Sequence, residues 1–154
     1  MNTLELTKEF FNQKRIAMVG VSRDPKHFSR KLYGELSRRG YEVLPVNPNV
    51  DEIDGRSCYP HVAAINAPLK CALLMTPQNI THQVVPECAS AGIDLLWIYG
   101  ISGPRSMTPQ TLQACEQKGL RVIPGYCPYM FLGHASFYHR LHGLAWKAIG
   151  RYPK

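Results

Sequence analysis

The stretch Ile16-Ala17-Met18-Val19-Gly20-Val21-Ser22-Arg23 changes at Gly20 from an unbroken apolar run to a polar turn. A short continuous apolar run is typical of a strand buried on both faces of a parallel sheet. Gly20 follows it directly, where a tight turn favours a residue that tolerates positive φ. Residues 29–39 carry Leu32 and Leu36 at helical spacing and end before a glycine. The stretch therefore predicts a strand, a tight turn and a helix.

The same alternation continues along the chain. Buried strands are predicted at 42–46, 71–75, 95–98 and 120–123, a very short strand at 57–59, and helices at 81–91 and 108–119. Such alternation indicates an α/β fold of Rossmann type, an open parallel sheet with helices on both faces. Pro45 favours the edge of the sheet or the end of its strand. We see no linker or repeat, so a single domain over residues 1–154 is predicted, with an N-terminal helix at 3–12 and a C-terminal helix at about 131–149.

The composition of the chain limits the classes of binding partner that are expected. The chain of 154 residues is 45% hydrophobic and 19% charged, with a formal net charge of +7. The positive charge favours an anionic partner, but the basic residues are scattered, so a phosphorylated small molecule is expected and nucleic acid is not. The longest apolar runs are too short to span a bilayer, which predicts no membrane partner. The low charged fraction leaves room for a self-association face and hence a homo-oligomer.

The cysteines and the N-terminal segment indicate the cellular compartment in which the protein is expected. The chain has five cysteines and no CxxC pair. The odd number and the spacing favour neither a disulfide framework nor a zinc site. Acidic residues occupy the N-terminal segment where a signal peptide would be basic. We therefore expect a cytoplasmic protein with reduced thiols.

A ligand site is expected at the rim formed by the carboxyl ends of the parallel strands. The first turn precedes a helix, whose N-terminal N–H groups and dipole favour phosphate. Ser22, Arg23, Lys26 and Ser29 would add donors and positive charge. The alternative interpretation is an ordinary basic loop with a serine helix cap.

The first turn lacks the dinucleotide fingerprint. Ser22 and Pro25 stand where the second and third glycines of that motif would be. The second strand ends in Val46-Asn47-Pro48, without the acid that holds the ribose hydroxyls of NAD. A ligand with a phosphate on its ribose suits this end better. NADP and coenzyme A both carry such a phosphate.

Four segments together resemble a known family. They are Val19-Gly20-Val21-Ser22-Arg23-Asp24-Pro25, Gly40-Tyr41-Glu42-Val43, Pro45-Val46-Asn47-Pro48 and Asp54-Gly55. In this order they are similar to the stand-alone coenzyme A-binding proteins, which resemble the coenzyme A-binding domain of the succinyl-CoA synthetase alpha subunit. The resemblance runs from about Lys14 to Cys127. It implies a Rossmann-type fold with coenzyme A or acyl-CoA as the bound cofactor.

The resemblance also implies a set of contacts at the rim. The nucleotide phosphates would meet the first turn, the adenosine would lie at the end of the second strand, and the pantetheine would pass the later strands. The implied residues are Gly20, Val21, Ser22 and Arg23 at the phosphates, Val46, Asn47 and Pro48 at the adenosine, Thr76, Pro77 and Ile80 beside the nucleotide, and Ile98, Tyr99 and Gly100 on the pantetheine side.

Departures from the synthetase pattern favour binding without catalysis. Tyr126 and Tyr129 flank Cys127-Pro128 where the synthetase has Asn and Gly. The synthetase reaction also needs a phosphohistidine on a second domain and a partner subunit, and we expect this chain to end where that domain would begin. Two alternatives stay open, an NADP-dependent oxidoreductase and one subunit of a split acyl-CoA synthetase.

The remaining reactive side chains are interpreted as structural. His134, His139 and His142 lack the acids and further ligands that a metal site needs, so we predict surface or interface histidines and no metal. Cys127 follows the last strand and is expected to be buried. No local triad, carboxylate pair or Walker loop is evident, so no catalytic residue is predicted.

Overall fold

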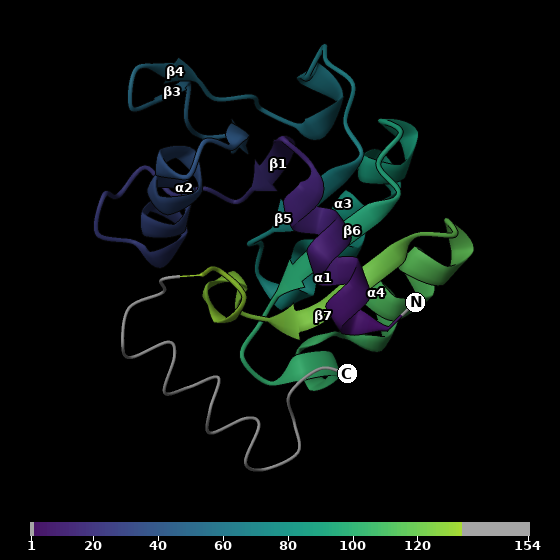
Figure 1. The fold of residues 1–154 in the computed structure, drawn as a ribbon. Coiled ribbons are helices and arrows are strands. Elements are labelled where there is room, and N and C mark those ends of the chain that lie inside the picture. The colour runs from purple at the N-terminus through teal and green to yellow at the C-terminus, as the bar shows by residue number, and fades with distance from the viewer. Residues whose placement is uncertain (1, 134–154) are drawn as a thin grey trace.

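A computed structural model gives the structure of the protein over residues 2–133. The core is a five-stranded parallel sheet. Helices cover both of its faces (Figure 1). The strands are β1 (Arg15–Val19), β2 (Glu42–Val46), β5 (Cys71–Leu74), β6 (Leu95–Tyr99) and β7 (Arg121–Tyr126). The helices are α1 (Thr3–Asn12), α2 (Phe28–Arg38), α3 (Gln78–Ser90) and α4 (Pro109–Gln117). The predicted single-domain α/β fold is confirmed.

Two apolar clusters cover the two faces of the sheet. On one face α1 and α2 pack against side chains that include Ile16 and Met18 of β1. On the other face α3 and α4 pack against side chains that include Ala17 and Val19. Successive side chains of a strand point to opposite faces of the sheet, and here both faces are covered by helices. The residues that face each side must therefore be apolar. This explains why β1 is apolar without interruption.

The strand order creates a crevice beside β1. The order is β2-β1-β5-β6-β7, so the chain leaves β1 towards one edge and later returns to its other side. Ligands of open parallel sheets bind beyond the carboxyl ends of the strands at such a switch point. β2 forms the edge of this sheet, as predicted from Pro45.

The connection between β2 and β5 differs from the prediction of a lone strand at 57–59. A hairpin forms instead, from β3 (Glu52–Ile53) and β4 (Arg56–Ser57). It turns at Asp54 and Gly55, whose φ angles are 50° and 76°. An Asp-Gly pair with positive φ is typical of a type I′ turn. The prediction was wrong because the partner strand before the turn is only two residues long.

Several element boundaries also differ. α3 begins at Gln78, earlier than the predicted residue 81, because Pro77 occupies its N-cap with φ −55°. β7 continues to Tyr126, past the predicted end at residue 123. The predicted C-terminal helix at about 131–149 lies outside the described residues from position 134 onward. Within residues 2–133, no helix combines the length and the apolar character needed to cross a membrane.

Candidate functional site

The turn after β1 approaches the end of β5 closely. Gly20 has a φ of +92°, which only glycine adopts without strain. A Cβ at this position would lie 3.0 Å from the carbonyl carbon and oxygen of Met75. The backbone is held there by hydrogen bonds from the Gly20 N–H to the Val46 carbonyl and from the Met75 N–H to the Val19 carbonyl, both 2.8 Å long. Gly20 is therefore required both by conformation and by space.

Hydrogen bonds within the turn lead into α2. The Ser22 N–H donates to Ser29 Oγ at 2.9 Å, and the Asp24 N–H donates to Ser22 Oγ at 3.0 Å. His27 caps the helix, because its Nδ1 accepts from the Ser29 N–H at 3.2 Å. The serine cap of the alternative interpretation is not found, because a histidine occupies the N-cap. Ser29 is fully buried, and its hydroxyl stabilises the turn from inside.

Arg30 ties this turn to the hairpin. Its guanidinium donates to the carbonyl oxygens of Ser22 at 3.3 Å and Arg23 at 2.9 Å, and it forms an ion pair with Asp54. Only 12% of the Arg30 side chain is exposed. A charged side chain that is enclosed and engaged in this way fixes the loop that it contacts. The sequence contained no local signal for this role.

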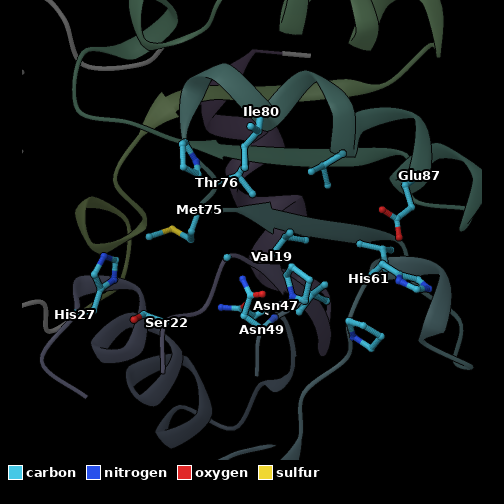
Figure 2. Close-up of a pocket in the computed structure, with 17 residues that line it drawn as sticks. Val19, Ser22, His27, Asn47, Asn49, His61, Met75, Thr76, Ile80 and Glu87 are labelled. Atoms are coloured by element: carbon cyan, nitrogen blue, oxygen red, sulfur yellow. Dashed lines mark hydrogen bonds between the residues drawn. The ribbon is translucent and has the colours of Figure 1, made fainter. Parts of the chain in front are cut away.

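A cavity of about 510 Å³ lies at the switch point, between the ends of β1, β2 and β5 and the first turns of α3 (Figure 2). Most of the predicted nucleotide contacts line it. They are Gly20, Ser22, Val46, Asn47, Pro48, Thr76, Pro77 and Ile80. Val21 is also on this turn but is fully buried, and its carbonyl oxygen accepts from the Asn47 side-chain amide at 2.8 Å.

The cavity also contains residues that the sequence did not indicate. They come from the end of β1, the α2 cap, the segments after β2 and after the hairpin, and the later turns of α3. The residues are Val19, His27, Asn49, Pro60, His61, Val62, Val84 and Glu87. Met75, at the end of the strand predicted at 71–75, lines the cavity as well. Glu87 and His61 are neighbours at one end of the cavity (Figure 2). The Glu87 carboxylate also accepts a hydrogen bond from the Ala63 N–H at 3.0 Å. Their segments are distant in the sequence, so no local pattern marked them.

A second cavity of about 430 Å³ adjoins the first. Met75, Thr76 and Pro77 line both cavities, so the end of β5 separates them. Tyr99 and Gly100, predicted for the pantetheine, line this second cavity, whereas Ile98 is buried in the core beneath them. Arg23 and Lys26 are exposed on the first turn and line neither cavity.

The end of β2 is polar but carries no acid. The Asn47 side chain donates to the Val21 carbonyl and accepts from the Asn49 N–H at 2.9 Å. Asn47 therefore joins the first turn to the end of β2 while it lines the larger cavity. An acid that could hold two ribose hydroxyls does not follow this strand, as the sequence indicated.

The thiols near the site are buried. Cys127 is 7% exposed, and burial raises the pKa of its thiol to about 11. All five cysteines are free and buried. No group of His, Cys, Asp and Glu side chains within residues 2–133 is arranged to hold a metal ion. His134, His139 and His142 lie outside those residues.

The fold and the crevice define the class of protein, an α/β domain of Rossmann type with a cavity at its topological switch point. Comparison with known proteins identifies the family. The model of the family described as CoA binding domain matches residues 14–132. The chain belongs to this family.

Individual relatives agree with this assignment. The alpha subunit of acetate–CoA ligase (ADP-forming) II from Pyrococcus furiosus is 27% identical over 134 residues, covering 82% of this chain and 29% of the subunit. The uncharacterized protein YneT of Bacillus subtilis is 25% identical over 123 residues, covering 80% of this chain and 88% of YneT. A solved structure, the dinucleotide-forming acetyl-coenzyme A synthetase 1 of Ca. Korarchaeum cryptofilum in complex with phosphate and ADP, has a TM-score of 0.67 at 26% identity, covering 77% of this chain and 27% of that chain.

The matched region makes up a different share of each relative's own length. This chain spans less than a third of the ligase subunit and the synthetase, but most of YneT. The similarity to the alpha subunit of the ADP-forming ligase therefore covers less than a third of that subunit.

Proposed function

We propose that this chain binds coenzyme A or an acyl-CoA along the two adjoining cavities and does not itself transform the ligand. The observation that carries the proposal is the position of both cavities at the carboxyl ends of the strands, separated only by Met75, Thr76 and Pro77. A long ligand with a nucleotide at one end needs such an extended path. Membership of the CoA binding domain family supplies the ligand class.

The larger cavity would hold the nucleotide. Its volume of about 510 Å³ is within the ordinary range of a cofactor pocket. The diphosphate would lie at the first turn, where the N–H group of Arg23 makes no hydrogen bond to another described residue. Arg23 and Lys26 would add positive charge from the exposed side of the turn. The pantetheine would then cross Thr76 towards Tyr99 and Gly100 in the second cavity.

A binding role without catalysis is supported by the chemistry of the site. Burial keeps the Cys127 thiol protonated near neutral pH, so it is a poor nucleophile. The carboxylate of Glu87 accepts a backbone hydrogen bond at the nucleotide end, distant from the expected position of the ligand thiol. Five buried free thiols also suit the reducing cytoplasm in which we propose that the protein acts.

A thermal-shift titration with coenzyme A, dephospho-coenzyme A, NADP and NAD tests the proposal. A ligand that binds only the folded state raises the melting temperature as its concentration increases. At a ligand concentration of a hundred times Kd, the added free energy of unfolding is about 2.7 kcal/mol. We expect the largest shift with coenzyme A and a smaller one without the 3′-phosphate. A shift with NADP alone would instead support an oxidoreductase.

The first turn can be tested with a double variant. Ser22→Ala/Arg23→Ala removes one turn hydroxyl and one exposed cation, and we expect the Kd for coenzyme A to rise about tenfold. Lys118→Ala is the matched control, because it removes an exposed cation at the end of α4, just before β7 begins and so at the opposite edge of the sheet. Unchanged affinity in the double variant would place the phosphates elsewhere.

A second candidate function is that of a subunit in a split acyl-CoA synthetase. The similarity to the alpha subunit of an ADP-forming ligase favours it. Such a role requires a nucleotide-binding partner chain. Co-expression with a candidate partner followed by size-exclusion chromatography tests it, and the same column separates a heteromeric complex from a homo-oligomer.

A further inference from the structure

Arg105 brings a positive charge to the second cavity. It lies in a short 3-10 turn, Gly103–Ser106, between β6 and α4. Of the described residues that line this cavity, Arg105 is the only one that carries a charge. No salt bridge or side-chain hydrogen bond connects it to another residue in the described part of the chain. An arginine at a cavity that has no acidic wall attracts an anion, and its planar fork suits a carboxylate.

The turn that carries Arg105 is held firmly against the sheet. Ser106 is buried, and its hydroxyl accepts from the Ser102 N–H at 3.1 Å. A Cβ on Gly100 would collide with the Ser106 side chain, and a Cβ on Gly125 would collide with the Gly103 carbonyl. These close approaches leave the turn little freedom. The backbone that carries Arg105 is therefore fixed before a ligand arrives, and the exposed side chain extends from a defined position beside the cavity.

The rest of the second cavity is mixed in character. Tyr99, Ile101 and Met75 contribute apolar surface, and 62% of Ile101 is exposed. Thr76, Ser102 and Gln78 contribute uncharged polar groups. A bare phosphate would leave the apolar surface unused, and a fully apolar acyl chain would leave the guanidinium without a partner. A short carbon chain that ends in a carboxylate satisfies both.

We infer that the second cavity selects acyl-CoA thioesters whose acyl group ends in a carboxylate, and that Arg105 recognises this carboxylate. The inference rests on the proposed coenzyme A site, because the nucleotide must occupy the larger cavity for the acyl group to reach the second one. It goes further by assigning the chemical class of the acyl group to one residue. Arg105 lies across the β5 end from the first turn, so the ligand phosphates are not its expected partners.

Isothermal titration calorimetry with defined thioesters tests this inference. The probes are malonyl-, succinyl- and glutaryl-CoA, with butyryl-CoA as the uncharged acyl control and coenzyme A as the reference. We expect at least one carboxylated thioester to bind about tenfold more tightly than butyryl-CoA, the value of one partly screened arginine–carboxylate pair. In Arg105→Gln this preference should disappear, while the affinity for coenzyme A and butyryl-CoA stays the same.

Two controls separate the possible failures. Lys118→Gln removes the same charge at the start of β7, at the opposite end of the strands from Arg105, and should leave the preference intact, which excludes an effect of net charge. Absence of coenzyme A binding in the unmodified chain would overturn the proposed function. Coenzyme A binding with no preference for carboxylated thioesters would overturn only the inference about Arg105. An equal loss of affinity for every ligand in Arg105→Gln would also overturn it, because the arginine would then contact coenzyme A itself.

Discussion

Gly20 lies against the backbone of Met75, so that a Cβ on Gly20 would sit 3.0 Å from the Met75 carbonyl oxygen. This contact joins the first turn to the end of β5 at the point where the two cavities meet. It fixes the separation of the two strand ends that flank the expected nucleotide.

We predict that Gly20→Ala destabilises the fold by more than the cost of placing an alanine at a positive φ. Gly40→Ala is the matched control, because Gly40 has a φ of +91° and a methyl group added there would have no neighbouring atom within 4 Å. The conformational strain should cost about 1–2 kcal/mol in both variants. Crowding against Met75 should add about 1–3 kcal/mol in Gly20→Ala. Urea unfolding measures both, and equal losses would contradict the close approach.

Arg30 is predicted to act as a positioning residue for the first turn. In Arg30→Gln the carbonyl oxygens of Ser22 and Arg23 lose their charged donor, and Asp54 loses its ion pair. We expect an increase of about tenfold in the Kd for coenzyme A, together with faster amide exchange across the turn. Lys31→Gln, at the next and exposed position of α2, should change neither. If Arg30→Gln weakened coenzyme A binding but left amide exchange in the turn unchanged, Arg30 would instead contact the ligand directly.

The ion pair between Glu9 and Arg121 is predicted to make stability depend on pH. It joins α1 to β7 through contacts of 2.7 Å and 2.8 Å, and the Arg121 guanidinium holds the pKa of the Glu9 carboxyl below its ordinary value. A carboxyl group whose pKa is lower in the folded state than in the unfolded state stabilises the fold when the pH is above its unfolded pKa of about 4.3. This stabilisation is lost as the pH falls through the pKa of the folded state.

Glu9→Gln should therefore lower the free energy of unfolding by about 1 kcal/mol at neutral pH, a value suited to a partly exposed pair. The difference from the unmodified chain should shrink below about pH 4. Denaturant unfolding at several pH values measures this. Glu116→Gln changes an exposed acid on α4 and should show no such difference, and a constant difference in Glu9→Gln at all pH values would rule out the linkage.

The cysteines are predicted to resist alkylation in the folded protein. Burial raises the pKa of Cys127 and Cys115 to about 11, and that of Cys71 and Cys88 to about 12. Thiolate is the reactive form, so iodoacetamide should label these residues slowly at neutral pH and rapidly in urea. Peptide mass spectrometry locates the label. Fast native labelling of Cys127 would contradict its structural role and support a thiol function beside the cofactor.

Much of the architecture was predictable because it depends on local pattern. Unbroken apolar runs at β1 and β5 indicated strands buried on both faces, and the residues after them indicated the rim. The hairpin was missed in part, because strands of two residues carry too little periodicity to be recognised. Its turn at Asp54-Gly55 carries a residue pair that is typical of a tight hairpin turn.

The sequence by itself determined the class of fold and the strand ends that line the crevice. Burial and turn formation are encoded by residues close together in the chain, so those features could be predicted. The tertiary structure alone decided that Arg30 reaches Asp54 and that Arg105 stands at the second cavity. These arrangements depend on how distant segments pack, because a side-chain hydrogen bond or a cavity wall exists only once both of its sides are in place.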